Sequence, residues 1–284
     1  MSSAQPEAVS PRRMADTMRQ VSVGAGAAVA IVASAAGAGA FGGVSIASAA
    51  GGAFSSEATV LAPAGPAFGI WSVIYAGLAA FAVFQALPSQ ATNPRLRTLS
   101  WWVLLSMLLN AAWIVAARAE LLSLSVAVIV ALVVVLAIAA VGLRRVRPTT
   151  VAEALVTDAT VGAYLGWTAV ATIANVTAVL VDAGAGPLLL GPTGWSVTLM
   201  ALGAAVAVSL AVYARYNPAL TIGIGVAMAW GLMWIALGRL MDDPANLPVG
   251  WAAGIAAAIA FGAPFAAIDF SRGDHRVTRS PAQS

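Results

Sequence analysis

The chain alternates between long apolar runs and short polar segments, and eight of the runs are long enough to cross a bilayer. A membrane-spanning helix needs about 20 predominantly apolar residues. The runs cover residues 21–50, 67–87, 99–117, 121–143, 151–181, 194–213, 218–237 and 248–270. They are continuously apolar and do not alternate every second residue, which favours helices over strands. The pattern therefore predicts an all-α fold, a polytopic transmembrane helical bundle of about eight helices.

The arginines fall almost entirely into every second gap between these runs. Only Arg118 and Arg239 lie in the other gaps. The remaining ones are Arg12, Arg13, Arg19, Arg95, Arg97, Arg144, Arg145, Arg147, Arg215, Arg272, Arg276 and Arg279. Because an excess of basic residues in short loops marks the cytoplasmic side, we expect both termini in the cytoplasm. The expected location is a plasma membrane of the bacterial type.

Composition supports a membrane protein and excludes several classes of function. Apolar residues make up 61% of the chain and charged residues 9%, against roughly half and one quarter in soluble domains. The net charge of +3 is spread over many segments, so membrane lipid is the expected partner and nucleic acid is not. The chain has no cysteine and no lysine, and its one histidine is His275 near the C-terminus. Familiar zinc and iron–sulfur sites, lysine Schiff bases and Ser/His/Asp catalysis are thereby excluded.

The two ends of the chain are polar and are expected to be disordered cytoplasmic tails, residues 1–20 and 271–284. The first apolar run has two interpretations. Basic residues followed by Ala-x-Ala triplets are typical of a cleaved signal peptide. A retained helix is favoured by the length of the run and by small residues at helical spacing, which suit helix packing in a bilayer. These small residues are Gly26, Ala30, Ser34, Ala38 and Gly42.

The second run begins with a Pro/Gly-rich segment that leads into three aromatic residues. Phe68, Trp71 and Tyr75 follow at i, i+3 and i+7, so they lie on one stripe of the helix. An aromatic belt at the membrane interface explains Phe68 on its own. Trp71 and Tyr75 lie one to two turns deeper, where a phenol needs a hydrogen-bond partner. This pair is therefore a candidate for the lining of a pocket.

The third and fifth runs also carry polar and aromatic stripes. In the third, Ser106, Asn110 and Trp113 share one face, and Asn110 suits either a pocket or a bond to another helix, worth roughly 0.6–2 kcal/mol. In the fifth, one stripe carries aromatic and small residues and its neighbour carries polar ones. The first consists of Tyr164, Trp167, Ala171 and Ala174, and the second of Thr168, Thr172 and Asn175. Such a helix should face the bundle interior or a cavity.

The acidic residues are few, and only Asp158 lies well inside a run. It is a candidate proton-relay carboxylate, or it pairs with Arg144, Arg145, Arg147 or a polar group on a neighbouring helix. The other acids near the ends of runs are expected to be solvated. They are Glu153, Asp182, Asp242, Asp243 and Asp269.

In this order, the three segments resemble the TspO/MBR family, the tryptophan-rich sensory proteins whose animal members are called translocator proteins. The matching pieces are Phe68-Gly69-Ile70-Trp71 through Tyr75, Asn110-Ala111-Ala112-Trp113, and Tyr164-Leu165-Gly166-Trp167 with Thr172 and Asn175. The chain departs from the family at Ile70, where a proline is usual. The resemblance covers residues 21–181, the family's five-helix fold, and leaves 182–270 as a three-helix extension of a longer branch.

The resemblance implies a hydrophobic-ligand site that is enclosed by the five helices and open toward the loop between the first and the second. Family members bind porphyrins and related tetrapyrroles, sterols or drug-like aromatics. The matching positions give the candidate ligand-binding residues Phe68, Trp71, Tyr75, Asn110, Trp113, Tyr164, Trp167, Thr172 and Asn175. The leading interpretation is a receptor or sensor for a hydrophobic aromatic ligand such as a porphyrin, with no obligatory cofactor. The alternatives are a transporter with Asp158 as coupling acid, and a light-dependent porphyrin-degrading enzyme using Trp71, Trp113 and Trp167.

The three-helix extension is expected to pack against the five-helix core. In that position it would replace the homodimer contact of smaller family members. A homodimer and an unknown regulatory protein both remain candidate partners. Trp234-Ile235 with Arg239 repeats the arrangement of Trp113-Ile114 with Arg118. The repeat fits either an ancient duplication or two snorkelling arginines at helix ends.

Overall fold

The protein is an all-α bundle whose long helices match the apolar runs of the sequence. The computed structural model describes residues 11–37, 50–184 and 190–277. Its long helices are α1 (Pro11–Gly37), α2 (Ile70–Ala86), α3 (Pro94–Arg118), α4 (Leu122–Arg145), α6 (Thr160–Asp182), α7 (Gly191–Ala214), α8 (Pro218–Met241) and α9 (Leu247–Val277). Eight spans in the described residues are long and apolar enough to cross a membrane. The predicted fold class is confirmed, and the chain is an integral membrane protein.

Short helical turns complete the described structure. The segment between α1 and α2 contains the 3₁₀ turns η2 (Ala50–Gly52) and η3 (Gly65–Gly69), and η4 (Pro88–Gln90) joins α2 to α3. The single turn α5 (Val151–Glu153) and the π-helical turn η5 (Ala154–Ala159) run directly into α6. A π-helical turn is rare and often marks a site where an extra side chain is accommodated.

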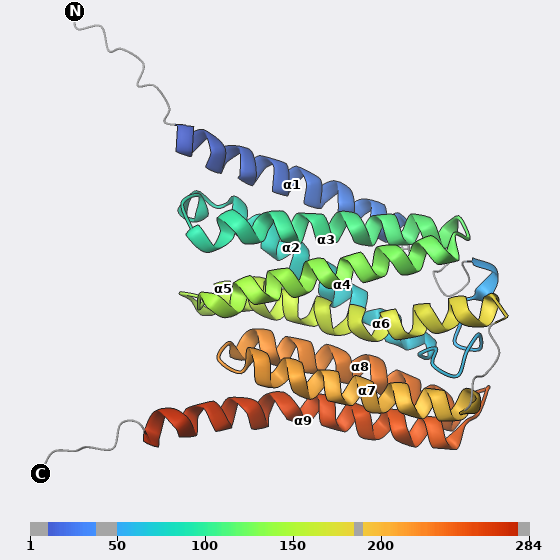
Figure 1. Cartoon of the computed structure of the whole chain (residues 1–284). Coiled ribbons are helices and arrows are strands. Elements are labelled where there is room, and N and C mark those ends of the chain that lie inside the picture. Colours follow the sequence, from blue (N-terminus) through green and yellow to red (C-terminus); the bar gives the residue numbers. More distant parts are fainter. Residues whose placement is uncertain (1–10, 38–49, 185–189, 278–284) are drawn as a thin grey trace, which may run out of the picture.

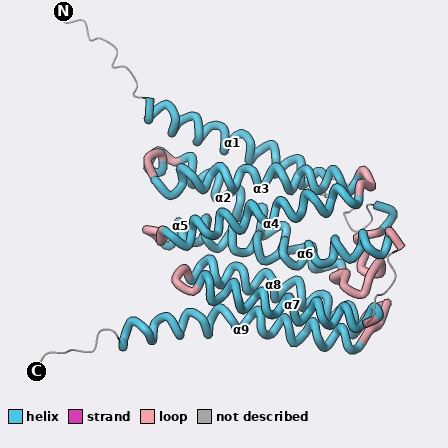
Figure 2. Tube along the Cα trace, in the orientation of Figure 1, coloured by secondary structure: helices cyan, strands magenta, loops and turns pink. Residues whose placement is uncertain are grey.

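The helices lie side by side in the order α1, α3, α4, α6, α8, with α2 behind α3 and α4 (Figures 1 and 2). The helices α7 and α9 cover the outer side of α8. Consequently α6 lies between the other four helices of the five-helix part and the three last helices. The beginning of α1 and the end of α9 lie at the same end of the bundle (Figure 1).

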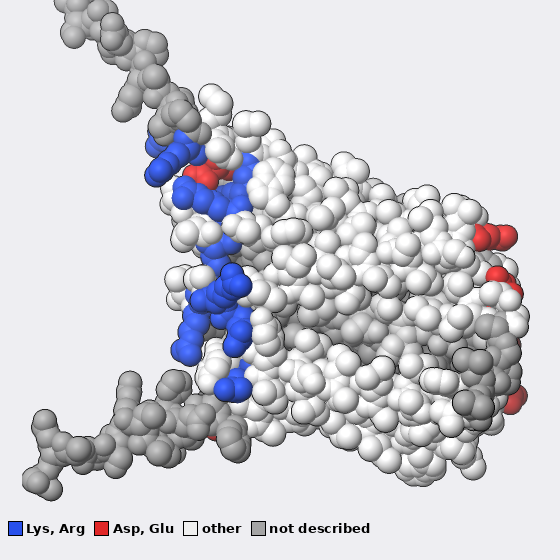
Figure 3. All heavy atoms as spheres, viewed as in Figure 1, with Lys and Arg blue, Asp and Glu red and all other residues white. Residues whose placement is uncertain are grey.

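Basic side chains gather at that end, which we call the basic end, and acidic side chains are seen at the opposite end (Figure 3). The asymmetry expected from the arginine positions is therefore present in three dimensions. The assignment of the basic end to the cytoplasm stays a prediction from the basic-residue rule.

The first helix begins earlier than the apolar pattern indicated. It starts at Pro11, inside the stretch 1–20 expected to be a disordered tail, and ends at Gly37. Asp16 and Arg19 are buried against neighbouring helices, and these polar contacts extend the helix beyond its apolar part. On its small-residue face, Ala30 and Ser34 are buried, and a side chain at Gly26 would meet Leu104 of α3. Ala38 and Gly42 lie outside the described residues.

A buried ionic cluster joins α3 to the start of α6 at the basic end. Arg95 donates from Nη1 to Glu153 Oε1 at 3.2 Å and from Nε to the carbonyl oxygen of Val146 at 2.9 Å. Its Nη2 pairs with the Asp158 carboxylate. Asn217, the N-cap of α8, donates from Nδ2 to Asp158 Oδ1 at 2.6 Å. The cluster therefore links three helices that are distant in sequence.

One of two expectations about the acids was wrong. Glu153 is not solvated: 1% of its side chain is exposed, and Thr149 donates to its Oε2 from both N and Oγ1. For Asp158 the second alternative is confirmed: it does not pair with Arg144, Arg145 or Arg147 but with groups on neighbouring helices, Arg95 of α3 and Asn217 of α8. In both cases Arg95 supplies the charge that makes burial of a carboxylate tolerable.

The contact between α6 and α8 is close enough for backbone atoms to touch, because glycines lie on both helices. A Cβ added at Gly162 would lie 2.4 Å from the carbonyl oxygen of Leu220, and one at Gly166 would lie 2.3 Å from that of Ile224. From the other side, a Cβ at Gly223 would lie 2.6 Å from the carbonyl oxygen of Ala159. Small residues of this kind allow helices to approach in a bilayer, where dispersion contacts replace the hydrophobic effect.

We therefore predict that Gly162→Ala lowers the stability of the bundle by about 1–3 kcal/mol, the usual cost of overpacking a core. The added methyl group meets backbone atoms, which cannot rotate away. Thermal unfolding of the purified protein in detergent measures the effect. The matched control is Gly142→Ala in α4, where no atom lies within 4 Å of the new Cβ, so its melting temperature should stay equal or rise. Equal melting temperatures for the two variants would contradict the role given to this contact.

Candidate functional site

A small cavity lies at the end of the bundle opposite the basic end. It is enclosed by the segment between α1 and α2 and by side chains of α3 and α6, and its volume is about 40 Å³. The lining is almost entirely apolar. It consists of Ala53, Phe54, Thr59, Ala62, Pro63, Phe68, Trp113, Trp167, Val170, Ala171, Ala174 and Asn175. We call residues 53–68, which lie over the cavity, the covering segment.

Aromatic rings from the covering segment meet the tryptophans of α3 and α6 across the cavity. The ring of Phe54 lies 5.7 Å from that of Trp113, tilted by 54°. The ring of Phe68 lies 6.1 Å from that of Trp167 in an edge-to-face arrangement. Aromatic pairs in this range attract each other beyond simple burial of area. The two phenylalanines therefore act as the apolar contacts that hold the covering segment over the cavity.

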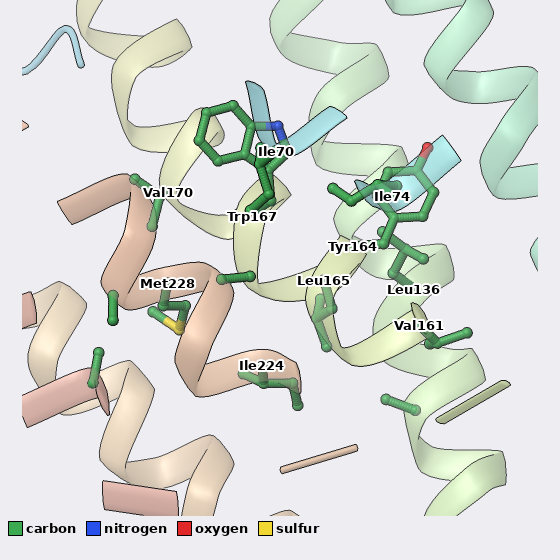
Figure 4. Close-up of a cluster of buried hydrophobic side chains, with 14 of the residues drawn as sticks. Ile70, Ile74, Leu136, Val161, Tyr164, Leu165, Trp167, Val170, Ile224 and Met228 are labelled. Carbon is green, nitrogen blue, oxygen red and sulfur yellow. The ribbon is translucent and has the colours of Figure 1, made fainter. Parts of the chain in front are cut away.

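A second group of rings lies next to the cavity, between α2 and α6. Trp71 stacks on Tyr75 at 5.3 Å and meets the edges of Tyr164 and Trp167 at 5.9 and 6.1 Å. Figure 4 shows Trp167 beside Ile70 and Tyr164 beside Ile74, so both α6 rings point toward α2. Trp167 thus belongs to both groups and connects the cavity to the interior of the bundle.

The polar groups of the second group bond to each other across helices. Asn110 of α3 donates from Nδ2 to Tyr75 Oη at 3.1 Å and to Ser34 Oγ at 3.2 Å. Tyr164 donates its hydroxyl to the carbonyl oxygen of Ser106 at 3.1 Å. Asn110 is therefore bonded to α1 and α2, which is the helix-joining alternative expected from its position. Its Oδ1 is buried and has no hydrogen-bond partner among the described residues.

Thr172 and Asn175 lie further along α6, and they differ in what they contact. Asn175 lines the cavity and exchanges hydrogen bonds with Ser125 of α4 at 3.0 and 3.1 Å. Thr172 donates its hydroxyl to the carbonyl oxygen of Thr168 at 2.7 Å, within its own helix, and is not part of the cavity wall. Asn175 fixes α4 against α6 and also presents an amide to the cavity.

The nine residues expected at the site therefore fall into three places. Phe68, Trp113, Trp167 and Asn175 line the cavity. Trp71, Tyr75, Asn110 and Tyr164 form the adjoining cluster between α1, α2, α3 and α6. Thr172 is half-buried beside them on α6. The three helices singled out in the sequence thus converge at one end of the bundle.

Two indole N–H groups at the cavity have no hydrogen-bond partner in the described part of the chain. They belong to Trp113 and Trp167, and both nitrogen atoms are buried. A buried donor without a partner costs about 1–3 kcal/mol. A ligand or water that offers acceptor atoms inside the cavity would recover this free energy.

The loop between the first two helices was expected at the mouth of the site, but its residues that line the cavity before Phe68 were not singled out in the sequence. Phe54 and its neighbours Ala53, Thr59, Ala62 and Pro63 lie outside the helical motifs, where no periodic pattern exists to indicate a position. The Pro/Gly-rich composition of residues 63–66 predicted a turn but not the surface that it would face.

Helix α8 holds the covering segment in place through three contacts. Trp230 donates from Nε1 to the carbonyl oxygen of Ala67 at 2.8 Å, and the carbonyl oxygen of Trp234 accepts from the backbone N–H of Ala64 at 3.2 Å. Arg239 donates to the carbonyl oxygens of Thr59 at 3.2 Å and Ser56 at 2.7 Å. The expectation that Arg239 snorkels was wrong, because its side chain is fully buried beneath this segment.

The acids of the ionic cluster do not take part in the cavity. Asp158 and Glu153 lie at the basic end, and neither belongs to the cavity wall. Within the described residues, no group of three or more His, Cys, Asp or Glu side chains could hold a metal ion. The chemistry that this site offers is stacking on aromatic faces and hydrogen bonding to indole and amide groups.

Comparison with known proteins identifies the family. A search of curated proteins and a search of solved structures each gave no match. A family model described as "TSPO-like protein" matches residues 20–266. The matched range contains α2, α3 and α6 with their aromatic residues, and it also runs through α7 and α8 into α9. The chain belongs to the TSPO-like protein family.

Proposed function

We propose that the protein is a membrane receptor or sensor that binds a flat hydrophobic aromatic ligand of the porphyrin class under the covering segment. Family membership supports a membrane sensor or binding protein in general. The observation that carries the specific proposal is the set of aromatic rings around one cavity, combined with the two buried indole donors that lack partners among the described residues. Aromatic faces stack on a conjugated ring, and the indole N–H groups fit the carboxylate or carbonyl oxygens at its edge.

The size of the cavity defines the state of the site. A volume of about 40 Å³ holds a few water molecules at most. Pockets for ligands of drug size are roughly 300–1,000 Å³. Under this proposal the small cavity corresponds to a closed state, in which Phe54 and Phe68 fill the space that a ligand would take. Binding of a porphyrin requires the covering segment to move away from α3 and α6.

The first test is quenching of tryptophan fluorescence by protoporphyrin IX in detergent. We expect saturable quenching, because Trp71, Trp113 and Trp167 lie at or next to the cavity. Trp167→Phe should weaken binding by about five- to tenfold, since loss of one hydrogen bond and part of one stacking contact costs about 1–1.5 kcal/mol.

Trp251→Phe is the matched control, because Trp251 lies on α9 with 65% of its surface exposed. Its binding curve should coincide with that of the unmodified protein. Quenching that does not saturate, or an equal loss of affinity in both variants, would contradict a site at the cavity.

A second prediction concerns iron porphyrin. His275 lies in the last turn of α9 at the basic end, and the chain contains no other histidine and no cysteine. The protein should therefore bind metal-free protoporphyrin IX and haem with similar affinity, through stacking and edge hydrogen bonds. Absorption and electron paramagnetic resonance spectra of the haem complex should lack the low-spin signature of two histidine ligands. Detection of that signature would refute this mode of recognition.

A third prediction concerns the hold of α8 on the covering segment. Arg239→Met keeps most of the buried aliphatic volume and removes the hydrogen bonds to Ser56 and Thr59. We expect faster hydrogen–deuterium exchange of the covering segment and a higher association rate for protoporphyrin IX, because less free energy opposes opening. The rate should rise on the order of tenfold, for one to two hydrogen bonds at about 1 kcal/mol each.

Arg145→Met is the control for this variant, since Arg145 is an exposed arginine at the end of α4, remote from the covering segment. It should leave exchange within residues 53–68 unchanged. The exchange measurement does not depend on the ligand. Unchanged exchange in Arg239→Met would therefore show that Arg239 does not restrain the segment, whatever the porphyrin titration gives.

A further inference from the structure

A second hollow, separate from the cavity, opens at the basic end between the first turns of α1 and α3. Its volume is about 340 Å³. Its walls are Arg12, Ala15, Asp16, Arg19, Arg97 and Trp101. Three arginines face a single carboxylate there, so the groove carries a net positive charge. We call it the arginine groove.

Some guanidinium N–H groups in the groove are not bonded to other described residues. Arg97 donates from Nε and Nη2 to the Asp16 carboxylate at 2.8 and 2.6 Å, and its Nη1 has no hydrogen-bond partner in the described residues. Arg12 is exposed and forms no ion pair within the described residues. An anion in the groove would therefore meet guanidinium N–H groups that are not already bonded to protein.

Arg19 forms the floor of the groove and is almost fully buried. Its Nη atoms donate to Gln85, to Ser100 and to the carbonyl oxygens of Gln90 and Ala91, at distances from 2.9 to 3.4 Å. All four acceptors are neutral, and the Nε atom has no partner among the described residues. A buried guanidinium is thus held by neutral groups, with Asp16 as the acid of the groove walls, and a further anion would offset its charge.

The backbone adds to the positive potential. Both α1 and α3 begin at this end, with Pro11 and Pro94 as their first residues. The amino end of a helix carries about half a positive charge and favours phosphate groups. The groove therefore combines arginine side chains with two helix ends of the same sign.

The surface that leads away from the groove is apolar. On α3, Trp101, Leu105 and Leu108 are exposed at i, i+4 and i+7, on the side of the helix that carries Arg97 to the groove. Because α3 runs away from the basic end (Figure 1), this row extends from the groove along the membrane-spanning part of the bundle. A half-exposed tryptophan at the top of such a row is typical of the membrane interface.

We propose that the arginine groove binds the headgroup phosphate of an anionic phospholipid, whose acyl chains lie along this apolar row. The planar guanidinium group of arginine can donate two parallel hydrogen bonds to phosphate oxygens. The net positive charge of the groove favours an anionic lipid over a zwitterionic one. Occupancy fastens α1 to α3, because the headgroup contacts side chains of both helices. This site is independent of the aromatic cavity and does not rest on the function proposed for it.

The test uses the full-length protein in nanodiscs of phosphatidylcholine with increasing amounts of phosphatidylglycerol. Lipids retained on the protein are counted by native mass spectrometry, and the melting temperature is measured in parallel. We expect preferential retention of phosphatidylglycerol and a rise in melting temperature that saturates. Arg12→Gln should raise the half-saturating fraction of phosphatidylglycerol about fivefold, the effect of one arginine at an anionic surface.

Arg147→Gln is the matched control, because Arg147 is an exposed arginine at the same end and outside the groove. It should leave the half-saturating fraction unchanged. Arg12 has no ion-pair partner to lose in the described residues, so Arg12→Gln should fold normally. Inorganic phosphate is titrated in phosphatidylcholine nanodiscs as a separate experiment. If phosphate stabilised the protein and phosphatidylglycerol did not, the groove would be assigned to a free anion and the lipid proposal would be overturned. Equal effects of Arg12→Gln and Arg147→Gln would overturn a specific site.

Discussion

The close contact of α6 with α8 is the interaction on which the rest of the structure depends. One side of α6 touches α8 through Gly162 and Gly166, where any side chain would meet backbone. Another side carries Trp167 and Asn175 to the cavity. Because a helix is stiff over this length, the position of the cavity wall is set by the packing on the opposite side. In a bilayer this packing relies on dispersion contacts, which fall off steeply with separation.

The sequence resemblance divides the chain into a five-helix core and a three-helix extension. The contact between α6 and α8 shows that the two parts pack together as one bundle. Helix α8 contacts α6 along its length and also holds the covering segment through Trp230, Trp234 and Arg239. The family match extends to residue 266, which is consistent with a family fold that includes the extension. Removal of the last helices would therefore take away the restraint on the covering segment together with one side of α6.

Periodic patterns predicted what depends on local sequence. The eight spans and the basic end follow from the hydrophobic pattern and the distribution of arginines, whereas the convergence of Trp71, Trp113 and Trp167 was implied by the family resemblance. The errors share one cause, a partner that is distant in sequence. Glu153 is buried because Arg95 reaches it from another helix, and Arg239 is buried because carbonyl groups of the covering segment surround it. The role of Phe54 was invisible for the same reason, since its ring acquires a position only through contact with Trp113.

Helix α8 is fixed at its beginning and along its middle, and this determines how the cavity can open. At its beginning, Asn217 is buried and bonded to Asp158 and to the carbonyl oxygen of Leu143. Along its middle, Gly223 lies against the backbone of α6. Sliding or tilting α8 would break a buried ionic cluster and a backbone contact together, whereas release of the covering segment breaks four hydrogen bonds to α8 and two aromatic contacts and exposes buried residues such as Leu61. Local opening of a connecting segment costs less than displacement of a packed helix. For the proposed binding of a ligand, we therefore expect the covering segment, and not α8, to move.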